Sequence, residues 1–260
     1  MFPEVQRGSQ AEQVGRLVLA AVLVVALPSL PLGNYLVYPF SILTTWFHEM
    51  GHGLTAILMG QEFEQLMIFP DGSGVAQSLV QNDISPFASA AIAAGGPLGP
   101  TLVGAALILA SAHERLWRPG LWAMSIAIFA SVILYVRSTV GYAVLPLVAV
   151  GLGLAAWKAP AGATRFLLQF LGLLGALSML RDFNYLFTEQ AVIEGRTMLS
   201  DTGQIEAALV LPHWVWATLI LMISAAIILA SLKYALSDKR RISTTPKPPG
   251  NVLKFGKTKR

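Results

Sequence analysis

Cysteine is absent from the 260-residue chain, which excludes disulfide bonds, thiolate metal ligands and cysteine nucleophiles. Any bound metal ion must therefore be held by nitrogen and oxygen atoms. Charged residues are also scarce, because Asp, Glu, Lys and Arg make up 12% of the chain whereas 55% is hydrophobic. This composition lies outside the range of soluble domains and predicts a protein embedded in a lipid bilayer.

The hydrophobic residues are gathered into runs of a length that suits membrane spans. Seven apolar segments lie at residues 17–32, 35–59, 86–112, 120–136, 140–157, 163–187 and 209–236. The first resembles a signal-peptide core that Pro28 and Pro31 interrupt, but no small-residue cleavage pattern follows it, so we interpret it as an uncleaved span or a re-entrant helix. The predicted class is an all-α polytopic membrane protein with about six or seven transmembrane helices in residues 1–236.

The remaining residues, 237–260, form a basic tail. Half of the eighteen Lys and Arg lie between Lys233 and Arg260, directly after the last apolar segment. The positive-inside rule predicts that this tail is cytoplasmic, as in a multi-pass protein of a bacterial inner membrane, and its composition predicts flexibility. The tail also accounts for the net charge of +4. We therefore expect the protein to contact the lipid bilayer and not to bind nucleic acid.

The most specific motif is His-Glu-Met-Gly-His at residues 48–52, inside the second apolar segment. Two histidines four residues apart project from one face of a helix, so His48 and His52 can bind a single Zn²⁺. Glu49 then stands beside the open position of the metal as a general base. A charged side chain at membrane depth costs roughly 2.5 to 3.5 kcal/mol, which favours a functional role over a merely solvated helix end.

Two further patterns surround this motif. Residues 62–80 hold two partly apolar runs on either side of Pro-Asp-Gly-Ser-Gly, which predicts a β-hairpin. Such a hairpin could bind an extended substrate as an additional strand, or it could be an ordinary surface hairpin. The third apolar segment contains Gly95, Gly96 and Gly99, whose spacing favours close helix packing against the metal helix over a direct catalytic role.

A catalytic zinc ion usually has three protein ligands, so the two histidines need a partner. Asp182 is the preferred candidate, because both it and His52 lie about seventeen to nineteen residues from the inner membrane surface and thus at similar depths. Asp182 could instead pair with the adjacent Arg181. Asp201 is the second candidate, although its Ser-Asp-Thr context equally predicts a helix cap.

The HEMGH motif, the PDGSG turn, the AAGGPLGP segment and a later membrane-embedded Asp together resemble the site-2 protease superfamily, and within it the peptidase M50B-like family. The resemblance covers residues 35–228 and implies an intramembrane metallopeptidase with one Zn²⁺ per chain, which hydrolyses peptide bonds of membrane-embedded or membrane-associated proteins. The chain departs from the better-known members, because Phe183 follows Asp182 where they have glycine. No substrate-binding residue can be assigned from the sequence.

Two other functions are compatible with the same residues. A catalytically silent membrane scaffold could keep the fold and the motif, but the intact HEMGH sequence favours hydrolysis. A metal-ion transporter would need several acidic or histidine residues along an intramembrane path, and such residues are sparse in the apolar segments. Peptide hydrolysis is therefore the preferred hypothesis.

Overall fold

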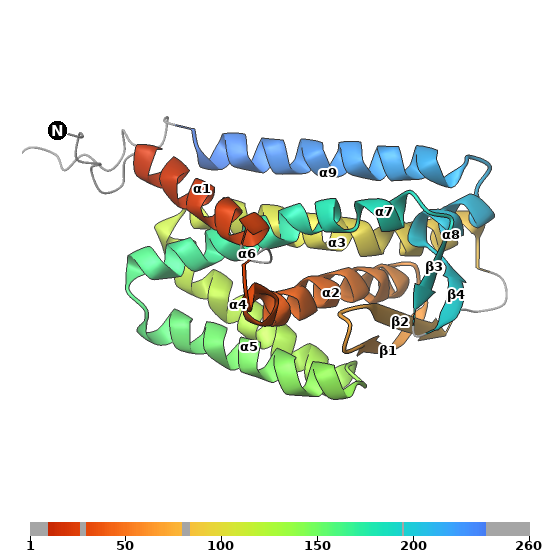
Figure 1. Ribbon diagram of the computed structural model, residues 1–260, viewed down its shortest axis with the longest axis horizontal. Helices are drawn as coiled ribbons and strands as arrows, with labels where there is room; N and C mark the ends of the chain where they lie inside the picture. The colour runs from red at the N-terminus through yellow and green to blue at the C-terminus, as the bar shows by residue number, and fades with distance from the viewer. Residues whose placement is uncertain (1–9, 27–29, 80–83, 194, 238–260) are drawn as a thin grey trace, which may run out of the picture.

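The computed structural model describes residues 10–26, 30–79, 84–193 and 195–237. In chain order, the elements of this part are α1 (Gln10–Ala26), α2 (Gly33–Leu58), β1 (Glu62–Ile68), β2 (Gly74–Leu79), α3 (Pro86–Ser111), α4 (Glu114–Leu134), α5 (Thr139–Lys158), α6 (Ala161–Arg181), α7 (Phe183–Leu186), β3 (Gln190–Ile193), β4 (Arg196–Leu199), α8 (Asp201–Ala208) and α9 (His213–Ala235). Figure 1 shows α2 in the middle of a helix bundle, with both β-hairpins at one end of the molecule.

The predicted class of a helical polytopic membrane protein is confirmed. In the described residues, five helices are long and apolar enough to cross a membrane by length and composition, namely α3, α4, α5, α6 and α9. The other two predicted segments are also helical. The first, α1, has 17 residues, and α2 has 26 but carries the polar residues of the HEMGH motif. The basic tail beyond residue 237 lies outside the described residues.

The helix that carries the HEMGH motif packs tightly against α3. A side chain at Gly51 would collide with the backbone carbonyl of Gly95, and one at Gly99 would lie 2.8 Å from the carbonyl oxygen of Phe47. The two backbones are therefore in direct contact, as the small-residue spacing predicts. On another side of α2, the indole nitrogen of Trp46 donates a hydrogen bond of 2.8 Å to Ser131 of α4, so α2 is fixed from two directions.

The predicted hairpin is confirmed as the antiparallel pair β1 and β2, in which Leu66 faces Ala76. Gly72 has a φ of 87°, a conformation that suits glycine at the turn. Two side chains of α2 bind the turn, because Tyr38 donates to the carbonyl of Pro70 at 3.1 Å and Thr45 donates to that of Gly72 at 2.5 Å. The hairpin is therefore held directly over the helix that bears the motif.

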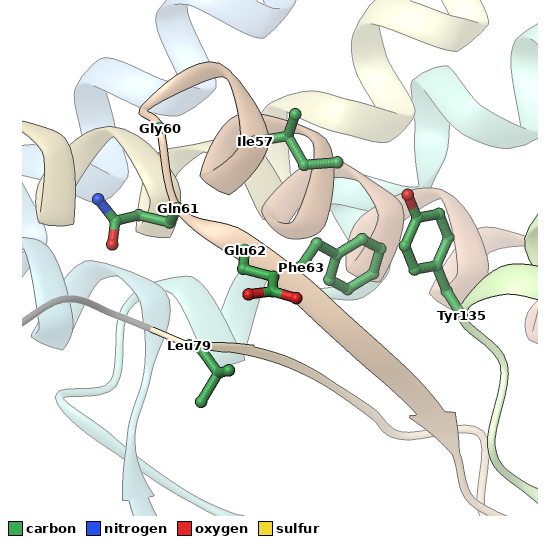
Figure 2. Close-up of a pocket in the computed structure, with 7 residues that line it drawn as sticks. All are labelled: Ile57, Gly60, Gln61, Glu62, Phe63, Leu79 and Tyr135. Atoms are coloured by element: carbon green, nitrogen blue, oxygen red, sulfur yellow. The ribbon is translucent and has the colours of Figure 1, made fainter.

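The outer edge of β1 is partly occupied by the connection between α4 and α5. Leu66 donates to the carbonyl of Tyr135 and accepts from the amide of Arg137, both at 2.9 Å. Figure 2 shows Phe63 and Tyr135 side by side at the base of the hairpin, where their rings stack at 4.3 Å and line a cavity of about 680 Å³. This cavity contains none of the candidate site residues. Among the described residues, β2 pairs only with β1.

The stretch between α6 and α9 is folded. It forms α7, the antiparallel hairpin β3–β4 and α8. Ser200 caps α8, since its hydroxyl accepts a hydrogen bond of 3.1 Å from the amide of Gly203. The predicted helix cap is thus present, and it is Ser200 that supplies it. Asp201, the next residue, is the first residue of the helix and its side chain is available for another role.

Candidate metal centre

Three potential ligands from distant parts of the chain meet at one point. His48 and His52 lie on α2, and Asp201 begins α8. The Nε2 atom of His48 is 3.0 Å from Oδ2 of Asp201, that of His52 is 3.2 Å from Oδ1, and the two Nε2 atoms are 3.2 Å apart. All candidate ligand atoms lie within 4.8 Å of one another, so this group could hold a metal ion.

The helix α3 orients the histidine pair. The Nδ1 atom of His52 lies 2.8 Å from the backbone carbonyl oxygen of Ile92, so in the neutral ring Nδ1 donates to this carbonyl and Nε2 has the lone pair that a metal needs. Gly96 supplies the space that the rings occupy, because a Cβ atom there would overlap His52 and lie 2.7 Å from Nε2 of His48. Close packing of α3 and the shape of the site therefore depend on the same glycine-rich run.

The carboxylate of Asp201 is suited to a cation. The residue is only 2% exposed, and its Oδ2 atom makes no hydrogen bond although it lies 3.0 Å from His48. Burial would raise the pKa of the Asp201 carboxyl, but the imidazoles of His52 and His48 outweigh it and hold this pKa below its usual range. A buried anionic oxygen without a hydrogen bond, next to two imidazole nitrogens, fits the donor set that zinc takes in proteins.

Glu49 lies on the same helix, next to the histidines, and is 5% exposed. Its carboxylate faces β2, where a Cβ atom at Gly74 would lie 2.7 Å from Oε1, and the backbone amide of Ala76 hydrogen-bonds to it. The hairpin thus leaves room for this carboxylate and helps to orient it. A buried acid beside a group of possible metal ligands is placed to act as a base toward a bound water.

A cavity of about 450 Å³ opens beside His48 and Glu49. One wall is α2, a second is the turn between β1 and β2, and the others come from the end of α6 and from β3. The polar residues of its lining are Asn34, Tyr38, Ser41, Thr44, Thr45, Asp71, Ser73, Ser178, Asp182 and Tyr185. Polar side chains therefore surround His48 and Glu49 inside a largely apolar bundle.

The two candidate aspartates occupy different places. Asp182 follows the last residue of α6 and lies on the cavity wall, outside the group formed by the histidines and Asp201. The geometry therefore reverses the order in which the sequence ranks them. Similar depth in the bundle puts Asp182 near the cavity, but the return of residues 188–201 toward α2 carries Asp201 to the histidines, and depth alone does not reveal that return.

The sequence model of the peptidase M50B-like family matches residues 16–231, which include α2, both hairpins and Asp201. The chain belongs to the peptidase M50B-like family. No curated protein and no solved structure gave a significant match. The resemblance to the site-2 protease superfamily is thus confirmed at the level of the family, which suggests a membrane metallopeptidase of this type.

The space at Gly96 gives a test of the metal centre in this M50B-like protein. Gly96→Ala should weaken zinc binding by about tenfold or more, because the new methyl group must displace one or both imidazoles. Gly151→Ala on α5 is the matched control, since no atom lies within 4 Å of a Cβ built there. Zinc content and affinity of the purified variants provide the measurement, and unchanged affinity in Gly96→Ala would contradict this view of the site.

Proposed function

We propose that this M50B-like protein is a zinc-dependent intramembrane metallopeptidase that hydrolyses peptide bonds of membrane-embedded or membrane-associated proteins. One observation carries the proposal: His48, His52 and Asp201 offer ligand atoms within 4.8 Å of one another, and Glu49 stands beside them on a polar cavity. The ligands would hold one Zn²⁺ per chain, which when bound supplies an acidified water and polarises the scissile carbonyl.

In this proposal, the residues around the ion have distinct roles. Glu49 accepts a proton from the attacking water and delivers it to the leaving amine. His52 is oriented through Ile92, and Asp201 is buried in the first turn of α8. Ser41 and Thr44 are among the polar residues that line the cavity beside Glu49.

The free edge of the first hairpin supports the proposal that the substrate binds in an extended conformation. Within the described residues, β2 pairs only with β1, while β1 has a second neighbour at Tyr135–Arg137. A peptide strand placed along β2 would form main-chain hydrogen bonds and pass Gly74 and Ala76, which adjoin Glu49. An extended conformation also exposes the carbonyl groups that a transmembrane helix hides, so a helical substrate would have to unwind locally.

We also propose that the protein lies in a bacterial inner membrane with a cytoplasmic C-terminus, and the arginine positions support this orientation. Arg16 donates to the carbonyl of Gly162 at 2.6 Å, and Arg118 donates to the carbonyl of Ala159 at 3.0 Å. These contacts bring the positive charges of one arginine from α1 and one from α4 to the connection between α5 and α6. The positive-inside rule assigns a connection of this kind to the cytoplasm.

The test is cleavage by the purified protein. Wild-type protein in detergent is expected to contain one zinc per chain and to cleave at least one of a panel of added membrane peptides. Chelation should stop the cleavage, and added zinc should restore it. Zinc binding without cleavage of any peptide would favour the scaffold alternative. Zinc uptake into proteoliposomes without cleavage would favour a transporter, and either result would overturn the proposal.

A further inference from the structure

The segment that presents Asp201 is fastened at the base of the second hairpin. The amide of Ser200 donates to the carbonyl of Glu189 at 2.9 Å, and the hydroxyl of Thr202 donates to that of Leu186 at 2.7 Å. Both Ser200 and Thr202 are buried. These bonds tie the start of α8 to the residues around α7 and fix the backbone on either side of Asp201. They do not fix the rotation of its carboxylate.

Besides the two histidines, one hydroxyl reaches that carboxylate. The hydroxyl of Tyr185 on α7 donates a hydrogen bond of 3.2 Å to Oδ1 of Asp201. Among the described residues, no other hydroxyl donates to this aspartate. The ring of Tyr185 lies 6.4 Å from the ring of His48, edge to face, and lines the same cavity. Tyr185 thus adjoins two of the three candidate ligands.

The two oxygens of Asp201 are in different situations as a result. Oδ1 accepts from Tyr185, whereas Oδ2 is buried without a hydrogen bond, 3.0 Å from His48. A hydrogen bond to one oxygen opposes rotation of the carboxylate and determines which oxygen is left for a cation. Outer hydrogen bonds of this kind orient metal ligands in proteins, and their loss weakens metal binding.

We propose that Tyr185 is a positioning residue of the metal centre, whose hydroxyl holds the carboxylate of Asp201 so that Oδ2 is presented to the ion beside His48 and His52. The inference rests on the proposed function in that it takes these three residues as the ligands. It adds a residue that neither contacts the ion nor belongs to the HEMGH motif, and it assigns distinct roles to the two oxygens of Asp201.

Tyr185→Phe removes this hydroxyl and keeps the ring that packs near His48. Tyr38→Phe is the matched control, because Tyr38 lines the same cavity but donates to the carbonyl of Pro70 on the hairpin turn. The three proteins, wild type included, are purified in detergent, stripped with a chelator and titrated with Zn²⁺ against a chromophoric competitor. Visible absorption of the Co²⁺-loaded proteins reports ligand geometry, and thermal unfolding of the metal-free proteins reports the fold.

We expect Tyr185→Phe to bind zinc about 10- to 100-fold more weakly, with an altered Co²⁺ spectrum and an unchanged metal-free Tm. Tyr38→Phe should match wild type in affinity and spectrum. Equal affinity in Tyr185→Phe and wild type would overturn the positioning role, and so would a weakening that Tyr38→Phe shares. Absence of stoichiometric metal binding by wild type would overturn both the proposed function and this inference. If wild type binds metal and only the comparison with Tyr185→Phe fails, this inference alone is overturned.

Discussion

Glu49→Gln is expected to abolish peptide-bond hydrolysis while the protein retains its zinc. The amide that replaces the carboxylate cannot accept a proton from water, and general acid–base catalysis contributes about 10²- to 10⁴-fold to such reactions. Glu49 is not among the three residues whose ligand atoms lie within 4.8 Å of one another, so metal binding should persist. The substitution preserves size, which matters because the side chain fits against Gly74 of the hairpin.

The measurement pairs zinc content with the rate of cleavage of a co-expressed membrane peptide. Glu64→Gln, a change of the same kind at an exposed position of β1, controls for the loss of one negative charge. Cleavage by Glu49→Gln at the wild-type rate would remove this residue from the role of general base. Loss of zinc in the same variant would instead indicate that the carboxylate supports the metal centre itself.

The helices could be predicted because their signal is local. Each of the seven apolar segments corresponds to a helix, since a long hydrophobic run in a chain with few charges satisfies its backbone hydrogen bonds most simply as a helix. The hairpin at residues 62–79 was predictable for a similar reason, because turn-forming residues separate two short runs. Both predictions required only neighbouring residues.

The second hairpin and α8 could not be predicted in the same way. Residues 188–208 mix polar, charged and apolar side chains without a clear period, and the strands have only four residues each. Their fold depends on bonds between distant positions, such as that of Thr202 with Leu186. A sequence pattern of period two or 3.6 carries no information about such bonds.

The candidate site divides along the same line. His48, Glu49 and His52 follow from their spacing on one helix. Asp201 is brought to them by the fold of the segment between α6 and α8. The depth of a residue in the membrane therefore could not predict that Asp201, and not Asp182, lies next to the histidines. Tyr185 has no sequence signal, because its neighbours Phe183 and Leu186 present it as part of an apolar segment. The sequence identifies the residue types of the site, but it does not predict which residues from distant parts of the chain come into contact.

The ligand assignment leads to the second large effect: Asp201→Ala should lose zinc, whereas Asp182→Ala should retain it. Removal of the Asp201 carboxylate leaves two imidazole ligands and takes away the anion that balances the ion in a buried site. Asp182 lies on the cavity wall outside the ligand group, so its replacement should alter the cavity but not the metal content. Each variant is compared by zinc content after purification and by competition with a chelator.

The two variants serve as controls for each other, because both remove one carboxylate from the surroundings of the same cavity. Loss of zinc in Asp182→Ala with retention in Asp201→Ala would restore the assignment favoured by depth and reject the group seen in the structure.

A pH titration adds a separate constraint on the wild-type site. Zinc should dissociate as the pH falls, because His48 and His52 bind the ion only through neutral imidazoles, and protons therefore compete with the metal.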